Sequence, residues 1–112
     1  MKETTEKINK FRDERNWRQF HNEKDLAISI SLEASELLEL FQWKTSEVTV
    51  SEKLPQIKEE LADVFIYAFM LADNLNLDVE KIIDDKIVVN SKKYPIKESF
   101  GTNKKYTEFK GE

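Results

Sequence analysis

Two long segments of this sequence, residues 22–43 and 51–75, contain no glycine and carry apolar residues at the spacing of an α-helix. The main apolar stripes are formed by Leu26, Ile30, Leu37 and Leu40 in the first segment and by Ile57, Leu61, Val64, Ala68, Leu71 and Leu75 in the second. Ile28 and Leu32 lie nearly opposite the first stripe, and a helix that is apolar on most sides is buried on more than one side. A protomer of 112 residues can hardly bury both segments alone, so the sequence predicts a partner subunit, most simply in a symmetric dimer.

The composition supports an all-α fold, because 36% of the residues are charged, 39% are hydrophobic, and only two glycines and two prolines are present. We expect a four-helix-bundle-like domain in residues 1–95 that assembles as a dimer or a dimer of dimers. Its expected helices span about 5–15, 22–43, 51 or 55 to 74, and 78–93, with caps at Asn22 and Asp78. The polar tail, residues 96–112, contains both glycines, and we expect it to become ordered when substrate binds.

Several classes of protein are disfavoured by the charge and the residue usage. The net charge of −4 offers no basic surface for long nucleic acid. The absence of cysteine excludes a disulfide framework and a thiolate metal site. The N-terminus lacks the apolar run of a signal peptide, and no apolar stretch reaches the length of a membrane span. We therefore expect a cytoplasmic protein that acts on small molecules rather than on nucleic acid or at a membrane.

Each of the two apolar segments also carries a pair of acids three residues apart. Glu33 and Glu36 occur in "LEASEL", and Glu60 and Asp63 occur in "EELADV". Acids at this spacing on a helix are about 5–6 Å apart at Cβ, and both pairs lie in or beside the apolar stripes. Two such pairs brought together would repel one another unless a hard cation such as Mg²⁺ bound between them. The alternative is that these acids are solvated surface residues, and the spacing alone leaves both interpretations open.

Longer stretches around these acids resemble a known family. The stretches are "FRDERNWRQFH", "LEASELLELFQWK", "EELADVFIYAFMLA", "NSKKYP" and "KKYTEF". They are similar to the MazG-like all-α nucleoside triphosphate pyrophosphohydrolases, and within them to the dCTP pyrophosphatase type. The resemblance implies a dimer-based assembly and Mg²⁺-dependent hydrolysis of a nucleotide to the monophosphate and pyrophosphate, a role in cleansing the nucleotide pool. It implies that Glu33, Glu36, Glu60 and Asp63 are the metal ligands and catalytic acids.

The same resemblance implies a substrate pocket formed by Trp17, Phe20, His21, Trp43, Tyr67 and Asn90. From the residues alone, a packed core is the favoured interpretation of both tryptophans and stacking on a base is the alternative, and the resemblance reverses this order. Asn90 can donate and accept hydrogen bonds, which suits a pyrimidine edge. Two departures from the family bear on base preference. Ile8 is apolar where we expect a polar substrate contact in the mammalian enzymes, and Leu32 precedes the acid where the family often has glycine.

The sequence leaves several alternatives open. The substrate is most simply dCTP or a modified dCTP, but dUTP or a noncanonical purine triphosphate fits the same superfamily. A non-catalytic helical dimerisation module is an alternative of a different class. The number of metal ions, the group that activates the water, and attack at the α- or β-phosphorus are also open. The candidates for holding the phosphates are Arg15, Lys86, Lys93, Lys104 and Lys105.

Overall fold

The computed structural model describes residues 2–109, and every regular element in this range is a helix. The chain divides into two compact units, Met1–Leu77 and Asp78–Glu112, which are described separately below. The last three residues of the predicted tail, 110–112, lie outside the described range, as does Met1. The all-α prediction is confirmed for the described residues.

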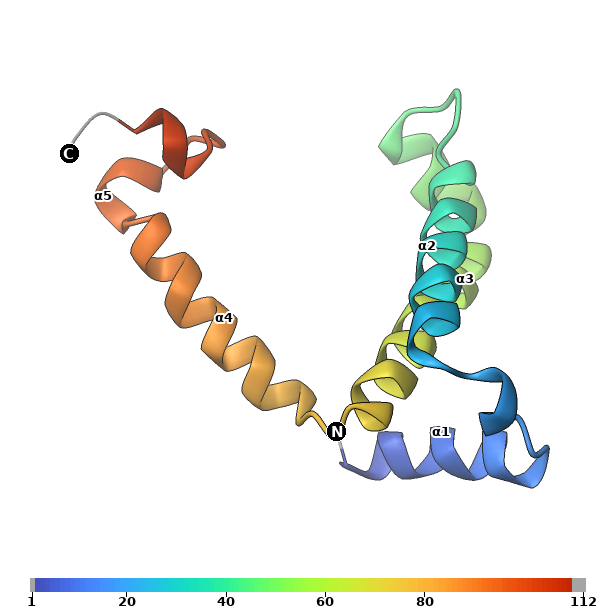
Figure 1. The fold of residues 1–112 in the computed structure, drawn as a ribbon. Helices are drawn as coiled ribbons and strands as arrows, with labels where there is room; N and C mark the ends of the chain where they lie inside the picture. The colour runs from blue at the N-terminus through green and yellow to red at the C-terminus, as the bar shows by residue number, and fades with distance from the viewer. Residues whose placement is uncertain (1, 110–112) are drawn as a thin grey trace. The chain divides into compact units, whose positions relative to one another are not determined.

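The first unit contains three α-helices and one short 3-10 helix. These are α1 (Lys2–Glu14), η1 (Arg18–Phe20), α2 (Glu23–Glu39) and α3 (Ser46–Asn74). α2 runs along α3, and α1 packs against the C-terminal part of α3 (Figure 1). The core lies where the three helices meet, and its buried apolar side chains are Ile8, Leu26, Phe69, Met70 and Ala72.

Side-chain caps explain where these helices begin. The Asn22 side chain accepts a hydrogen bond from the Asp25 backbone N–H (2.8 Å) at the start of α2. Asp78 accepts from the Lys81 N–H (3.1 Å) at the start of α4 in the second unit. Both caps were expected from the sequence, and each satisfies a backbone donor that the helix itself leaves without a partner.

The predicted start of the third helix, at residue 51 or 55, falls at the kink that divides α3 and is too late for the helix as a whole. α3 begins at Ser46, because Thr45 accepts a hydrogen bond from the Val48 N–H (3.2 Å) and caps a first turn that the sequence suggested was a loop. The helix is kinked at Lys53, whose φ of −122° and ψ of 17° are not helical. Pro55 explains the kink, because it lacks an N–H and its ring clashes with the preceding turn.

The second helix is also shorter than predicted, because α2 ends at Glu39 rather than near residue 43. Trp43 instead lies in the turn that follows, with a positive φ of 66°. A positive φ is uncommon for a bulky residue and cannot continue a right-handed helix. The connection between α2 and α3 is therefore a compact turn that leaves Trp43 93% exposed.

The second unit contains α4 (Val79–Lys93), the short α5 (Ile96–Ser99) and η2 (Tyr106–Glu108). The Tyr94 ring, at the end of α4, makes edge-to-face contacts with Tyr106 and Phe109, with ring centroids 5.9 Å apart in both cases. The tail therefore folds back on the end of its own helix. Further ordering by a bound substrate stays a prediction.

Much apolar surface stays exposed within the first unit. Leu38 is 70% exposed on α2, and Leu32 on α2 and Phe65 on α3 are more than half exposed. No helix among residues 2–109 combines the length and apolar character needed to cross a membrane. The core therefore covers only part of the apolar surface of α2 and α3, as their sequence patterns indicate.

Candidate metal and nucleotide site

Three of the four predicted acids converge between the two long helices of the first unit. α2 supplies Glu33 and Glu36, and α3 supplies Glu60. One carboxylate oxygen from each lies within 4.8 Å of the others, so the three can reach a common cation. Glu33 and Glu60 are half-buried, whereas Glu36 is exposed. We call these three residues the acid cluster.

The acid cluster is electrostatically strained without a cation. Partial burial, followed by the hydrogen bond and the charge of Glu36, raises the pKa of Glu33 to about 7. The hydrogen bond with Glu36, followed by burial, raises the pKa of Glu60. The Oε2 atoms of Glu33 and Glu60 are buried and have no hydrogen-bond partner in the described part of the chain. Buried carboxylate oxygens without partners, next to like charges, are what a hard divalent cation would stabilise.

Asp63, the fourth predicted acid, lies one turn after Glu60 and beside the acid cluster rather than within it. Its charge contributes to the raised pKa values of Glu33, Glu60 and Tyr67, so it lies close to all three. No lysine or arginine among residues 2–109 forms an ion pair with Asp63 or with the acid cluster. The arrangement therefore differs from four solvated acids that are each neutralised by a neighbouring base.

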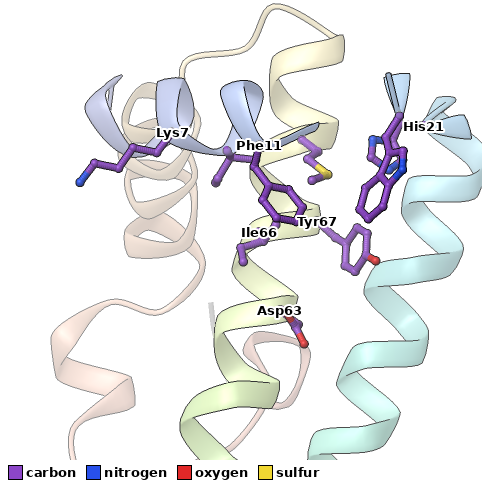
Figure 2. A pocket seen from close by; sticks show the side chains of 9 residues that line it. Lys7, Phe11, His21, Asp63, Ile66 and Tyr67 are labelled. Carbon is purple, nitrogen blue, oxygen red and sulfur yellow. The ribbon is translucent and has the colours of Figure 1, made fainter. Parts of the chain in front are cut away.

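A cavity of about 380 Å³ adjoins these acids through Asp63 and Tyr67 (Figure 2). Its lining residues are Lys7, Ile8, Phe11, Trp17, His21, Asp63, Ile66, Tyr67 and Met70. In Figure 2 the Tyr67 ring points from α3 toward α2, with its hydroxyl on the side of that helix. Burial, and then the charges of Glu33, Asp63 and Glu36, raises the pKa of this hydroxyl. The mostly apolar cavity thus opens beside a strongly acidic group of side chains.

Three rings form one side of the cavity, and we call Phe11, Trp17 and His21 the aromatic wall. Phe11 and Trp17 meet edge-to-face, with centroids 5.5 Å apart and planes at 80°. Trp17 and His21 are also nearly perpendicular, at 6.3 Å. Burial, followed by the charges of Arg12 and Arg18, lowers the pKa of His21, so its imidazole is neutral near pH 7. Its Nδ1 is buried without a partner among the described residues.

The structure brings some of the predicted pocket residues of the first unit to the cavity. Trp17, His21 and Tyr67 line the cavity. Phe20 does not line it and is 63% exposed, and the exposed Trp43 lies outside it. Asn90 belongs to α4 of the second unit. The substrate contacts assigned to Phe20, Trp43 and Asn90 stay predictions.

Sequence reasoning did not assign Lys7, Ile66 and Met70 to the pocket. Ile66 and Met70 lie three and seven residues after Asp63 on α3, so helical spacing from Asp63 would have identified them. No sequence pattern indicates that Lys7 lines the cavity, because its position depends on how α1 crosses α3. Arg15, a candidate for holding phosphate, instead donates to the Phe11 carbonyl (2.9 Å) and lies 3.9 Å from the Phe11 ring centroid.

The sequence model of the MazG-like family matches residues 28–109, about three quarters of the chain. This chain belongs to the MazG-like family. It is 36% identical to dCTP pyrophosphatase 1 of Mus musculus over 103 residues and 36% identical to that of Homo sapiens over 107 residues. These matches cover 88% of this MazG-like chain and 61% of each relative, so the chain spans about three fifths of the length of the curated relatives it matches.

A crystal structure of a pyrophosphatase from Archaeoglobus fulgidus has a similar fold, with a TM-score of 0.81 and 37% sequence identity. That similarity covers 85% of this chain and 92% of the archaeal one. The part of the MazG-like chain that matches the family model includes the acid cluster, Asp63 and Tyr67. The aromatic wall precedes residue 28 and lies outside that match.

Proposed function

We propose that this chain is a Mg²⁺-dependent nucleoside triphosphate pyrophosphohydrolase. The proposed reaction converts a pyrimidine triphosphate, with dCTP or a modified dCTP as the leading substrate, to the monophosphate and pyrophosphate. The observation that carries the proposal is the acid cluster, with two buried partnerless carboxylate oxygens, beside an apolar cavity. The relatives named dCTP pyrophosphatase 1 support the choice of nucleotide.

Glu33, Glu36, Glu60 and Asp63 are the residues that would hold Mg²⁺. When bound, the ion would neutralise triphosphate charge and polarise a phosphoryl oxygen, which is most of what such a reaction requires. The donor set fits, because it consists only of carboxylate oxygens, which Mg²⁺ prefers. Glu33 would bind the ion as a carboxylate and would lose its proton on binding, since its pKa of about 7 reflects the cation-free cluster.

The cavity would bind the base and the sugar. Its volume of about 380 Å³ lies in the range of small-molecule sites, and its walls are chiefly apolar and aromatic. Trp17 would contact the base, and neutral His21 would offer its partnerless Nδ1 as a hydrogen-bonding atom. Tyr67 lines the cavity and its hydroxyl is close enough to Glu33, Asp63 and Glu36 for their charges to raise its pKa, so it would contact the sugar that joins base and phosphates.

The test is pyrophosphate and monophosphate release from a panel of nucleoside triphosphates, with Mg²⁺ and with EDTA. We expect Mg²⁺-dependent cleavage of dCTP and 5-modified dCTP, and loss of most of it in Glu36→Gln. The matched control is Glu39→Gln, which makes the same change at an exposed position of α2 and should retain activity. Preferential cleavage of dUTP or a purine triphosphate would revise the substrate. If no nucleoside triphosphate of the panel is cleaved in the presence of Mg²⁺, the enzymatic proposal is overturned and a helical dimerisation module is favoured.

We also propose that the chain forms a homodimer or homotetramer. The support is the apolar surface that the first unit leaves exposed on α2 and α3, including Leu32, Leu38 and Phe65. Exposed apolar surface of this kind marks an interaction site more often than a solvated face. Light scattering coupled to size-exclusion chromatography would measure the mass directly, and a monomer at micromolar concentration would contradict the proposal.

A further inference from the structure

Arg12 is a fully buried arginine that does not line the cavity. Its side chain is 0% exposed, although it belongs to a helix that is otherwise largely exposed. Its Nη2 donates to Asp73 Oδ2 (3.0 Å) and to Asn74 Oδ1 (3.1 Å), and its Nε donates to Asn9 Oδ1 (3.2 Å). Burying a guanidinium is costly unless it is paired, so this network holds α1 against the end of α3.

The same network fixes both ends of the segment that carries Trp17 and His21, two of the three rings of the aromatic wall. At one end, the Arg12 carbonyl accepts a hydrogen bond from the Trp17 N–H (2.9 Å). At the other end, Asn74 Nδ2 donates to the His21 carbonyl (2.6 Å) and to Glu23 Oε2 (3.3 Å). Between them, Arg18 pairs with Asp13 and, more weakly, with Asp73 (3.4 Å).

These contacts make one connected unit, which we call the connector clamp: Arg12, Arg18, Asp73 and Asn74. Trp17 and His21 line the cavity, whereas none of the four clamp residues does. The Trp17 and His21 rings meet only edge-to-face, and the backbone between residues 17 and 21 joins them. The clamp therefore ties the segment that carries Trp17 and His21 to α3, the helix that carries Tyr67 and Asp63.

We propose that the connector clamp is a positioning device that sets nucleotide affinity by holding Trp17 and His21 at the cavity, without taking part in the chemistry. This inference rests on the proposed function, because its enzymatic readout is nucleotide turnover. It predicts that loosening the clamp weakens substrate binding more than it slows the bound reaction. A purely structural role predicts instead that stability, binding and turnover decline together.

The sharpest variant is Asn74→Asp. It keeps the oxygen that accepts from Arg12 but replaces the amide donor to the His21 carbonyl with a second oxygen. The control is Asn76→Asp, which adds the same charge at the exposed asparagine two residues later. For Asn74→Asp we expect KM for dCTP to rise about five- to tenfold with kcat within about twofold, a partial loss of the base-stacking contribution. Asn76→Asp should match the unmodified chain.

A second readout does not depend on catalysis. The indole N–H resonance of Trp17 in a ¹H–¹⁵N spectrum should shift in Asn74→Asp and stay unchanged in Asn76→Asp. An unchanged KM in an active Asn74→Asp enzyme overturns the inference, as does a joint fall of kcat, affinity and melting temperature. If the unmodified chain cleaves no nucleotide, the proposed function fails. The inference is then tested by the Trp17 indole resonance alone. If that resonance has the same chemical shift in Asn74→Asp as in the unmodified chain, the inference is overturned.

Arg18→Gln provides a second variant if Asn74→Asp does not fold. It removes the exposed pairs to Asp13 and Asp73 while leaving Arg12 and Asn74 in place. Loss of exposed pairs costs little stability, so the protein should fold. We expect a smaller rise in KM, about two- to fourfold, with kcat retained. A KM identical to that of the unmodified chain would then overturn the inference.

Discussion

At the scale of single residues, the titration of Glu33 gives the first prediction. Its folded pKa of about 7 exceeds the value of about 4.3 for an unfolded glutamate, so the folded chain binds more protons between these values. The free energy of unfolding of the metal-free protein should therefore fall as pH rises through this window. Glu33→Gln removes the titration and should raise the melting temperature near pH 8 in EDTA by about 2–5 °C.

Differential scanning calorimetry in EDTA across this pH range measures the effect. Ser35→Ala, an exposed change on the same helix, is the control and should keep the pH dependence of the unmodified chain. A melting temperature of the unmodified chain that rises steadily from pH 5 to pH 8 in EDTA would contradict the assigned strain in the acid cluster.

The charge of Arg12 gives the second prediction. Asp73→Asn removes the carboxylate that pairs with this buried guanidinium and should lower the free energy of unfolding by about 2–4 kcal/mol. Asp85→Asn is the matched control, since it breaks an exposed pair with Lys81 and should cost at most about 1 kcal/mol. Urea denaturation of the two variants compares them, and equal costs would show that Arg12 is not effectively buried.

At the scale of helices, the sequence was most informative where a side chain decides an end. Asn22 and Asp78 cap α2 and α4 as expected, because their hydrogen bonds are local and can be read from neighbouring residues. The first turns of α3 were missed, because Thr49 and the valines beside it have low helix propensity. Thr49 is fully buried, so tertiary packing outweighs that propensity, and no local rule detects it.

The acid cluster and the cavity differ in the same way, because the first depends on helical spacing and the second depends on contacts between residues distant in the sequence. Three of the four acids expected to converge, Glu33, Glu36 and Glu60, do lie together, because helical spacing and two neighbouring helices suffice to bring them together; their role as metal ligands stays a prediction. The cavity was predicted only in part. Its aromatic wall depends on hydrogen bonds from Arg12 and Asn74, which lie far apart in the sequence, and periodicity carries no signal of such contacts.

The cap of α3 gives the prediction at this scale. Thr45→Ala removes the side chain that accepts from the Val48 N–H and should lower the free energy of unfolding by about 1 kcal/mol. Thr4→Ala, at an exposed position within α1, should have little effect. Thermal denaturation compares the two variants, and an equal melting temperature for both would argue that α3 starts after the kink at Lys53.

At the scale of the whole molecule, the exposed apolar surface of the first unit leads to a prediction on assembly. Leu38→Glu places a charge on the most exposed leucine of α2 and should shift the protein toward monomer without unfolding it. Thr4→Glu adds the same charge at an exposed polar position of α1, away from this face of α2, and should assemble like the unmodified chain. Sedimentation velocity distinguishes the outcomes, and unchanged assembly in Leu38→Glu would exclude this face from the interface.

The central claim is that the converging carboxylates hold a divalent ion, and isothermal titration of the metal-free protein with Mg²⁺ tests it most directly. We expect saturable binding to the unmodified chain near pH 8, with affinity reduced at least about tenfold in Glu60→Gln. Glu59→Gln, the exposed neighbour on α3, should bind like the unmodified chain. Identical titration curves for all three proteins, or the absence of saturable binding to any of them, would contradict the account.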